Sequence, residues 1–293
     1  MSTTFSTLPL TRSHARRTLA AELRAFWAVV RKEWILFVRY PSWILALFVW
    51  PIIFPLMYIL SARALAGPDG SGLAVFRQMT GIQDYIGFIT VGTTIWMWQN
   101  IVLWDVGGKL RNEQLRGTLE SNWLTPTWRF SLLVGGSMVQ IVQMLLFLAI
   151  TALEFGLFFG VRFNGSAGLA GLVLLAAIPS IYGIGIAFAS VVINLKEANS
   201  FVFLVRGLVM VFCGITFPIS VLPAVMQKIA YWLPQTHIIH AFRQAALAGA
   251  SFSDLTPNLL PLALFGAFWL GVGFLAFTWM ERRARQTGAI GQY

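Results

Sequence analysis

Residues 169–193 read LAGLVLLAAIPSIYGIGIAFASVVI, a run in which no side chain is charged. A helix needs about 20 mainly apolar residues to cross the hydrocarbon core of a bilayer, and this run meets that length. Four more stretches meet it as well: 42–61, 85–103, 131–159 and 259–279. A sixth, 201–217, is shorter and carries Arg206 near its start, where a long side chain can reach the nearer interface. The sequence therefore predicts an all-α integral membrane protein with six transmembrane helices.

The composition agrees with a membrane protein. Hydrophobic residues make up 57% of the 293 residues and charged residues only 11%, so a water-soluble fold would expose large apolar patches. The net charge of +10 does not indicate nucleic acid, because the basic residues are scattered between apolar runs. The one cysteine, Cys213, lies in an apolar run, which excludes a disulfide framework within the chain. No cleaved signal is expected, since the N-terminal residues are polar and basic.

The basic residues predict an orientation. Six spans put both termini on one side, and the segments on that side hold fifteen basic residues: Arg12, Arg16, Arg17, Arg24, Arg31, Lys32, Arg39, Lys109, Arg111, Arg116, Arg129, Lys196, Arg282, Arg283 and Arg285. The opposite loops hold five: Arg63, Arg77, Arg162, Lys228 and Arg243. Because basic loops remain in the cytoplasm, both termini are predicted to be cytoplasmic. The membrane itself is expected, though not from charge, to be the plasma (inner) membrane of a bacterium or archaeon.

The chain divides into a cytoplasmic segment (1–41), a membrane domain (42–279) and a cytoplasmic tail (280–293). In the first segment an apolar stripe at helical spacing predicts an amphipathic helix along the interface, ended by Pro41: Leu19, Leu23, Phe26, Val30, Trp34 and Phe37. The segment 218–258 holds apolar pieces too short to cross a bilayer. Short re-entrant or interfacial helices on the outer side are expected there, before the last span.

The second cytoplasmic loop, 109–126, reads KLRNEQLRGTLESNWLTP. Leu115, Leu119 and Trp123 recur every four residues, so a single short helix would carry one apolar ridge opposite a polar face. Two interpretations of this helix remain open. It is either a knob for a groove on another protein or a solvated loop that docks on its own bilayer surface.

Several short motifs resemble those of type-2 ABC exporter permeases, the group that contains drug, polysaccharide and nodulation-factor exporters. Glu113, RGTLE at 116–120 and Thr125-Pro126 are similar to the cytoplasmic loop of these permeases. FPISVLP at 217–223, LPQTH at 233–237 and Arg243 are similar to their outer segment before the last helix. The number of spans and the amphipathic N-terminal helix agree with the same group.

The resemblance implies a coupling helix at 111–123 seated on a separate ABC ATPase, with 195–200 as a smaller second contact. The residues it assigns to ATPase coupling are Arg111, Glu113, Leu115, Arg116, Gly117, Thr118, Leu119, Glu120, Trp123, Lys196 and Glu197. Those it assigns to the outer gate or re-entrant segment are Phe217, Pro218, Pro223, Pro234 and Arg243. Within the bilayer, Tyr58, Trp96 and Phe212 are candidates for a substrate path.

The chain has no G-x-x-x-x-G-K-[ST] run, so it is expected to be a transporter subunit without an ATPase site of its own. No cofactor is expected in the chain, and ATP and Mg are expected on the partner. The expected partners are two ATPase copies, a second permease copy in a homodimer and membrane lipids, without nucleic acid. The expected function is ATP-driven export of a drug or of a lipophilic, lipid-linked or glycan-bearing substrate.

Two alternatives remain. A proton-coupled secondary transporter would need a titratable group within the membrane, for which Glu154 is the candidate, although its position predicts the outer interface. A lipid-modifying membrane enzyme would have to use His237, His240 and Arg243. The two histidines are four residues apart, but no carboxylate or thiol lies near them in the sequence to complete a metal site.

Overall fold

The computed structural model describes residues 18–67, 71–82, 84–125, 127–192 and 198–287, and every regular element among them is a helix. Five helices are long and apolar enough to cross a membrane. They are α2 (Pro41–Leu65), α4 (Tyr85–Leu115), α6 (Phe130–Phe159), α7 (Ala167–Val192) and α11 (Phe252–Thr287). They correspond to five of the six predicted spans, and the prediction of an all-α membrane fold is confirmed.

The predicted fifth span is shorter than expected. It forms α8 (Ala198–Phe212), whose 15 residues end five residues before the predicted boundary at Phe217. At 1.5 Å per residue α8 is about 22 Å long, against the roughly 30 Å of a hydrocarbon core. The helix stops because Gly214 takes a left-handed backbone with φ of 65°, and Pro218 follows shortly after it.

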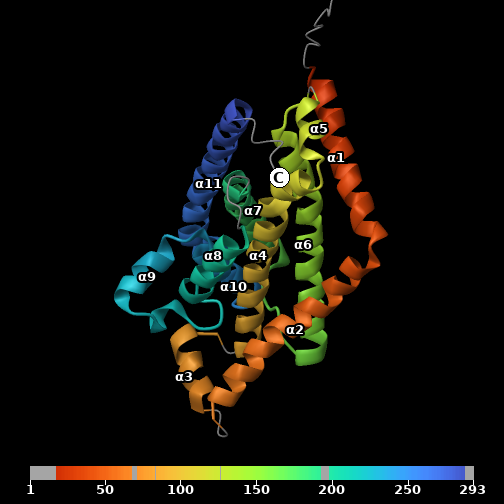
Figure 1. Cartoon of the computed structure of the whole chain (residues 1–293). Coiled ribbons are helices and arrows are strands. Elements are labelled where there is room, and N and C mark those ends of the chain that lie inside the picture. Colours follow the sequence, from red (N-terminus) through yellow and green to blue (C-terminus); the bar gives the residue numbers. More distant parts are fainter. Residues whose placement is uncertain (1–17, 68–70, 83, 126, 193–197, 288–293) are drawn as a thin grey trace, which may run out of the picture.

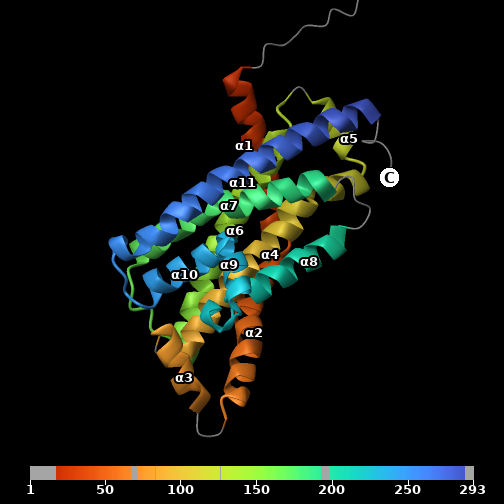
Figure 2. The same cartoon turned by 90° about the vertical axis from the view of Figure 1, so that its left-hand side faces the viewer.

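The bundle is built around α4. This helix packs against α2, α6, α7, α8 and α10 (Pro234–Ala246), and side chains such as Trp98, Val102 and Leu110 are almost fully buried. Helices α7 and α11 lie side by side along much of their length (Figure 2). The apolar runs on which the sequence prediction depends therefore pack partly on one another and partly face outward, as lipid-exposed helices do.

An amphipathic helix precedes the first span, as predicted. Helix α1 (Leu19–Arg39) begins at Thr18, whose Oγ1 accepts a hydrogen bond from Ala21 N at 3.3 Å, and α2 begins at Pro41. However, the face of α1 turned to the bundle passes through Val29, which packs over Gly135 of α6. Part of the predicted stripe points away, because Leu19, Leu23 and Trp34 are exposed.

The segment before the last span contains short helices, as predicted. The 3-10 helix η1 (Ile219–Val221) and α9 (Ala224–Tyr231) precede α10, whose side chains are largely buried. Helix α3 (Ser71–Thr80), which the sequence did not predict, lies at the same end of the molecule (Figure 1).

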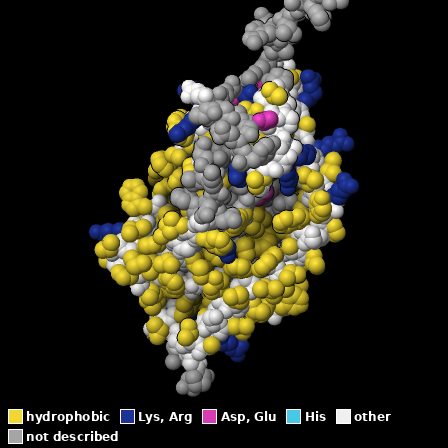
Figure 3. Space-filling model, in the orientation of Figure 1, with side chains coloured by type: hydrophobic (Ala, Val, Ile, Leu, Met, Phe, Trp, Pro, Cys, Tyr) yellow, Lys and Arg dark blue, Asp and Glu magenta, His cyan; other side chains and the backbone are white. Residues whose placement is uncertain are grey.

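Charged side chains are unevenly distributed. On the face drawn in Figure 3, charged side chains gather toward the end that holds α5 (Leu119–Leu124), and hydrophobic side chains cover most of the rest. This pattern is typical of a membrane protein, in which apolar side chains face the lipid and charged side chains gather at one membrane surface.

Candidate functional site

A break in the helix divides the predicted coupling segment in two. Helix α4 ends at Leu115, Gly117 has φ of 69°, and α5 begins at Leu119. Gly117 N donates to Gln114 O at 3.0 Å and Thr118 N donates to Glu113 O at 3.0 Å, the hydrogen-bond pattern of a Schellman motif. The prediction of one continuous helix over 111–123 is therefore wrong. Gly117 was the signal for the break, because glycine adopts this backbone conformation without strain.

The break also separates the predicted apolar ridge. Leu119 and Trp123 are 1% and 5% exposed and face their own bundle, with the Trp123 ring 6.5 Å from Phe277 of α11. Leu115 is instead 59% exposed. The expectation that all three form one surface for a partner is not met, since two of them are core residues.

Residues on the opposite side of this segment are exposed. Glu120 and Leu124 share the outer face of α5, and Leu115 and Arg116 are exposed beside them. Neither Arg116 nor Glu120 forms an ion pair with any residue that the structure describes. We call these four residues, Leu115, Arg116, Glu120 and Leu124, the docking face.

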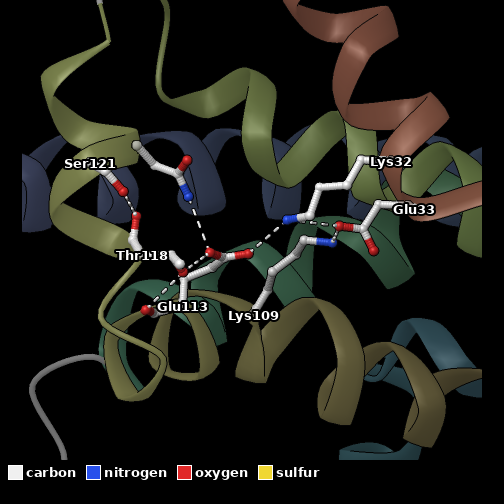
Figure 4. Close-up of polar contacts among 7 residues, drawn as sticks. Lys32, Glu33, Lys109, Glu113, Thr118 and Ser121 are labelled. Carbon is white, nitrogen blue, oxygen red and sulfur yellow. Dashed lines mark hydrogen bonds and ion pairs between the residues drawn. The ribbon is translucent and has the colours of Figure 1, made fainter. Parts of the chain in front are cut away.

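Charged side chains fasten the segment to α1 (Figure 4). Lys32 Nζ of α1 lies 3.1 Å from Glu113 Oε1 of α4, and Lys109 Nζ of α4 lies 2.9 Å from Glu33 Oε1 of α1. The other oxygen of Glu113 accepts hydrogen bonds from Thr118 Oγ1 and, at 3.1 Å, from Asn122 Nδ2. Glu113 therefore joins three elements at once, because α1, the end of α4 and α5 all contact its carboxylate.

Further contacts fasten the end of the loop. Arg129 donates from Nη2 to Trp123 O at 2.7 Å, and its Nη1 lies 2.6 Å from Glu281 Oε1 of α11. Glu22 of α1 accepts a hydrogen bond from Trp128 N at 2.9 Å. With these contacts, the segment from Glu113 to Arg129 is attached to α1, α4 and α11. The segment is therefore part of the packed bundle, and packed elements shift as bodies instead of deforming continuously.

The second predicted contact, 195–200, lies partly outside the described residues, and its last three residues form the start of α8. Lys196 and Glu197 belong to 193–197, for which the structure gives no placement. Arg111, also assigned to coupling, donates from Nη1 to Gln114 Oε1 at 2.6 Å and lies beside the break.

Arg243 forms the main polar junction at the other end. It is 6% exposed, and its guanidinium donates to Phe88 O of α4 and to Gly214 O and Ile215 O beyond α8, at 2.7 to 3.1 Å. A side chain at Gly92 would collide with Ile215 O and this guanidinium. Arg243 therefore holds α10, α4 and the end of α8 together.

The prolines of the segment before the last span precede or begin its short helices. Pro223 precedes α9, Pro234 is the first residue of α10, and Pro218 precedes η1. Phe217 is partly buried next to them. The sequence did not reveal what Arg243 binds, because its partners are backbone carbonyls that no side-chain pattern identifies.

The predicted path aromatics pack between helices. Trp96 is 2% exposed, its ring centroid lies 5.4 Å from that of Phe54 in a tilted arrangement, and its Nε1 donates to Arg206 O at 3.3 Å. Tyr58 donates to Met210 Sδ at 3.8 Å, and Phe212 is the last residue of α8. The guanidinium of Arg206 covers the Trp96 ring at 4.9 Å rather than pointing away from the bundle. These residues join α2, α4 and α8, and a path along them would require those helices to separate.

The structure also shows the surroundings of the residues on which proton-coupled transport or a lipid-modifying activity would depend. Glu154 is 8% exposed, and its Oε2 has no hydrogen-bond partner among the described residues. His237 contacts Asn258 Oδ1 and Tyr231 O, and His240 contacts Asn258 Nδ2 at 3.1 Å. In the described part of the chain no three His, Cys, Asp or Glu residues are grouped to hold a metal ion.

Comparison with known proteins identifies the family. No curated protein matches the chain. A family model described as "ABC-2 family transporter protein" matches residues 70–275, well over half of the chain, from α3 through most of α11. The family is one of permease subunits, which agrees with the spanning helices and implies an ABC ATPase partner in general terms. The chain is a multi-pass membrane protein that belongs to the ABC-2 transporter family.

Proposed function

We propose that the chain is the permease subunit of an ATP-driven exporter and that an ABC ATPase on a separate polypeptide binds its docking face. The observation that carries the proposal is the two-sided character of α5. Its inner side, Leu119 and Trp123, is fixed in the bundle, while its outer side exposes Glu120 and Leu124. A segment that transmits force needs both a fixed side and a free side.

The charges of the docking face suit a protein partner. Arg116 and Glu120 can each form charge-assisted hydrogen bonds, which are roughly twice as strong as neutral ones. Leu115 and Leu124, 59% and 85% exposed, supply apolar surface between them. Their loop follows the basic end of α4, so the positive-inside rule favours the cytoplasm, where ATP is available.

The contacts to α1 suggest which helices would move when the ATPase pushes on the docking face. Glu113 and Lys109 are paired with Lys32 and Glu33, so α1 is tied to the segment that carries the docking face. Helix α1 continues through Tyr40 into α2. Closure of two ATPase copies would therefore act on α1 and the first span together with α4.

The substrate and the assembly are proposed more broadly. The described bundle is filled around α4, so a path for a lipophilic, lipid-linked or glycan-bearing molecule is expected between two permease copies. The short helix α8 supports this arrangement, because Phe203, Leu204, Leu208 and Val211 expose apolar surface that a second copy can cover. Export from the cytoplasm or inner leaflet through a homodimer is the proposed activity.

Purification of tagged permease from its native membrane tests the proposal. An ABC-type ATPase should co-purify, and the complex should hydrolyse ATP in a manner that mutation of the partner's P-loop lysine abolishes. Recovery of the intact permease without an ABC ATPase, under conditions that preserve membrane complexes, would refute the proposal. Reporters fused after Tyr293 test the orientation independently.

A further inference from the structure

A cleft of about 390 Å³ opens beside α10, and the proposed coupling to an ATPase does not use it. We call it the α10 cleft. One wall is apolar and includes Ile82, Phe88 and Ile219. The other is polar: His240, Arg243, Gln244 and Asn258. The space is large enough for a small headgroup and part of a chain.

The charge in this cleft is not balanced. Arg243 lines it, and the guanidinium forms no ion pair with any described residue. Among the residues that the structure describes, none that lines the cleft is acidic. The acidic residues on the flanking elements are engaged elsewhere, since Asp84 caps α4 and Asp254 accepts hydrogen bonds from Ser251.

The guanidinium also has donor capacity left. Arginine has five N–H groups, and Arg243 makes four hydrogen bonds, all to backbone carbonyls. Carbonyl dipoles and the face of the Phe88 ring, 3.3 Å from the guanidinium carbon, stabilise the cation in part. They supply no full negative charge, and a buried cation without a counter-ion favours an anion nearby.

Neutral polar groups continue from Arg243 along the cleft. Asn258 Nδ2 contacts His240 Nδ1 at 3.1 Å and donates to Gln244 Oε1 at 3.4 Å. His240 lines the cleft, and although part of the residue is exposed, its imidazole is largely surrounded by protein. That burial, together with Arg243 and His237, lowers the pKa of its imidazole below the usual value. A lowered pKa favours the neutral ring, which can donate or accept a hydrogen bond.

We infer that the α10 cleft binds an anionic amphiphile, with the acidic headgroup toward Arg243, His240 and Asn258 and the hydrocarbon chain along Ile82 and Ile219. A phosphate or carboxylate would supply the missing negative charge. The apolar wall distinguishes an amphiphile from a free anion. The inference does not depend on the ATPase or on the docking face.

Substitution of Gln244 tests the inference, because this side chain lines the cleft and joins α10 to α11 only through a long hydrogen bond, 3.4 Å from Asn258 Nδ2. The full chain is purified in dodecyl maltoside and titrated with dodecyl phosphate. The two amphiphiles have the same hydrocarbon chain, so the neutral one, present in large excess, competes for any site that recognises the chain alone. Native mass spectrometry counts the dodecyl phosphate bound. Gln244→Glu should weaken binding about tenfold, equivalent to roughly 1.4 kcal/mol, and Gln244→Lys should strengthen it. Opposite effects of opposite charges cannot arise from loss of folding.

Two controls make the outcomes decisive. Gln78→Glu places the same new charge on α3, at an exposed position outside the cleft, and should leave binding unchanged. Inorganic phosphate at the same concentration as dodecyl phosphate should not displace it. Three outcomes would each overturn the inference. Wild type and both Gln244 variants could bind dodecyl phosphate equally, Gln78→Glu could lose as much binding as Gln244→Glu, or inorganic phosphate could displace the dodecyl phosphate.

Discussion

The pair formed by Lys109 and Glu33 gives the sharpest test of how α1 is attached. The nitrogen and oxygen are 2.9 Å apart, and the side chains are only 13% and 21% exposed. Two unit charges about 4 Å apart attract by about 4 kcal/mol at an effective dielectric constant of 20. Desolvation and the ordering of two long side chains offset much of this, so we expect a coupling free energy of about 1 to 2 kcal/mol.

A double-mutant cycle measures that coupling. The variants Glu33→Gln, Lys109→Met and the double variant are unfolded reversibly in mixed micelles, and the free energy of unfolding is compared with that of wild type. Each single variant should cost about 1 to 2 kcal/mol, and the double variant should cost clearly less than the two single losses combined. Arg24→Gln is the control, because Arg24 is exposed on α1 and forms no ion pair with a described residue. A coupling free energy within about 0.3 kcal/mol of zero would refute the proposed attachment.

Three further predictions concern other positions. Leu119→Ala should lower the free energy of unfolding by about 2 to 5 kcal/mol because Leu119 is buried, whereas Leu124→Ala, 85% exposed, should change it by less than about 0.5 kcal/mol; denaturant titration of both variants checks this contrast. Gly117→Ala should cost about 1 to 2 kcal/mol in the same titration, because alanine is strained at φ of 69°. Glu154→Gln should leave ATP-driven transport in vesicles unaffected, and loss of transport in this variant would favour the proton-coupled alternative.

The long helices could be predicted from the sequence because their signal is simple. An uncharged run such as 169–193 exceeds the length of a bilayer core wherever its side chains point, and α7 follows it to within two residues at each end. Pro41 likewise sets the boundary between α1 and α2 through its own backbone, without help from tertiary contacts. The end of α8 depended instead on Gly214, which the apolar run 201–217 concealed.

The faces of short helices could not be predicted in this way. A four-residue spacing placed Leu115, Leu119 and Trp123 on one ridge, and only the turn at Gly117 directs Leu115 outward and the other two inward. Spacing alone also cannot tell whether an apolar side chain packs on its own bundle or on a partner. Substitution of Leu119 is therefore expected to disturb the fold of the permease itself, and it is not a clean test of docking.

The charged contacts join residues far apart in the sequence. Glu113 was predicted to belong to the polar face, but its partner Lys32 is 81 residues away, and Arg243 binds the carbonyl of Phe88 in α4, which is 155 residues away. Neither pairing has a local pattern. Both depend on how the helices pack, which composition and periodicity do not specify.

Site-directed cross-linking tests the central claim, that the docking face on the exposed side of α5 contacts the ATPase. A cysteine in place of Leu124 on the docking face is compared with one in place of Val225 on α9, which is 71% exposed and therefore similarly accessible. The native Cys213 is 1% exposed and stays in both proteins. In membranes that contain the intact transporter, a short thiol-to-amine cross-linker should join Leu124→Cys to the ATPase and leave Val225→Cys unattached. Attachment through Val225→Cys, or none through Leu124→Cys while the complex remains intact, would contradict the account.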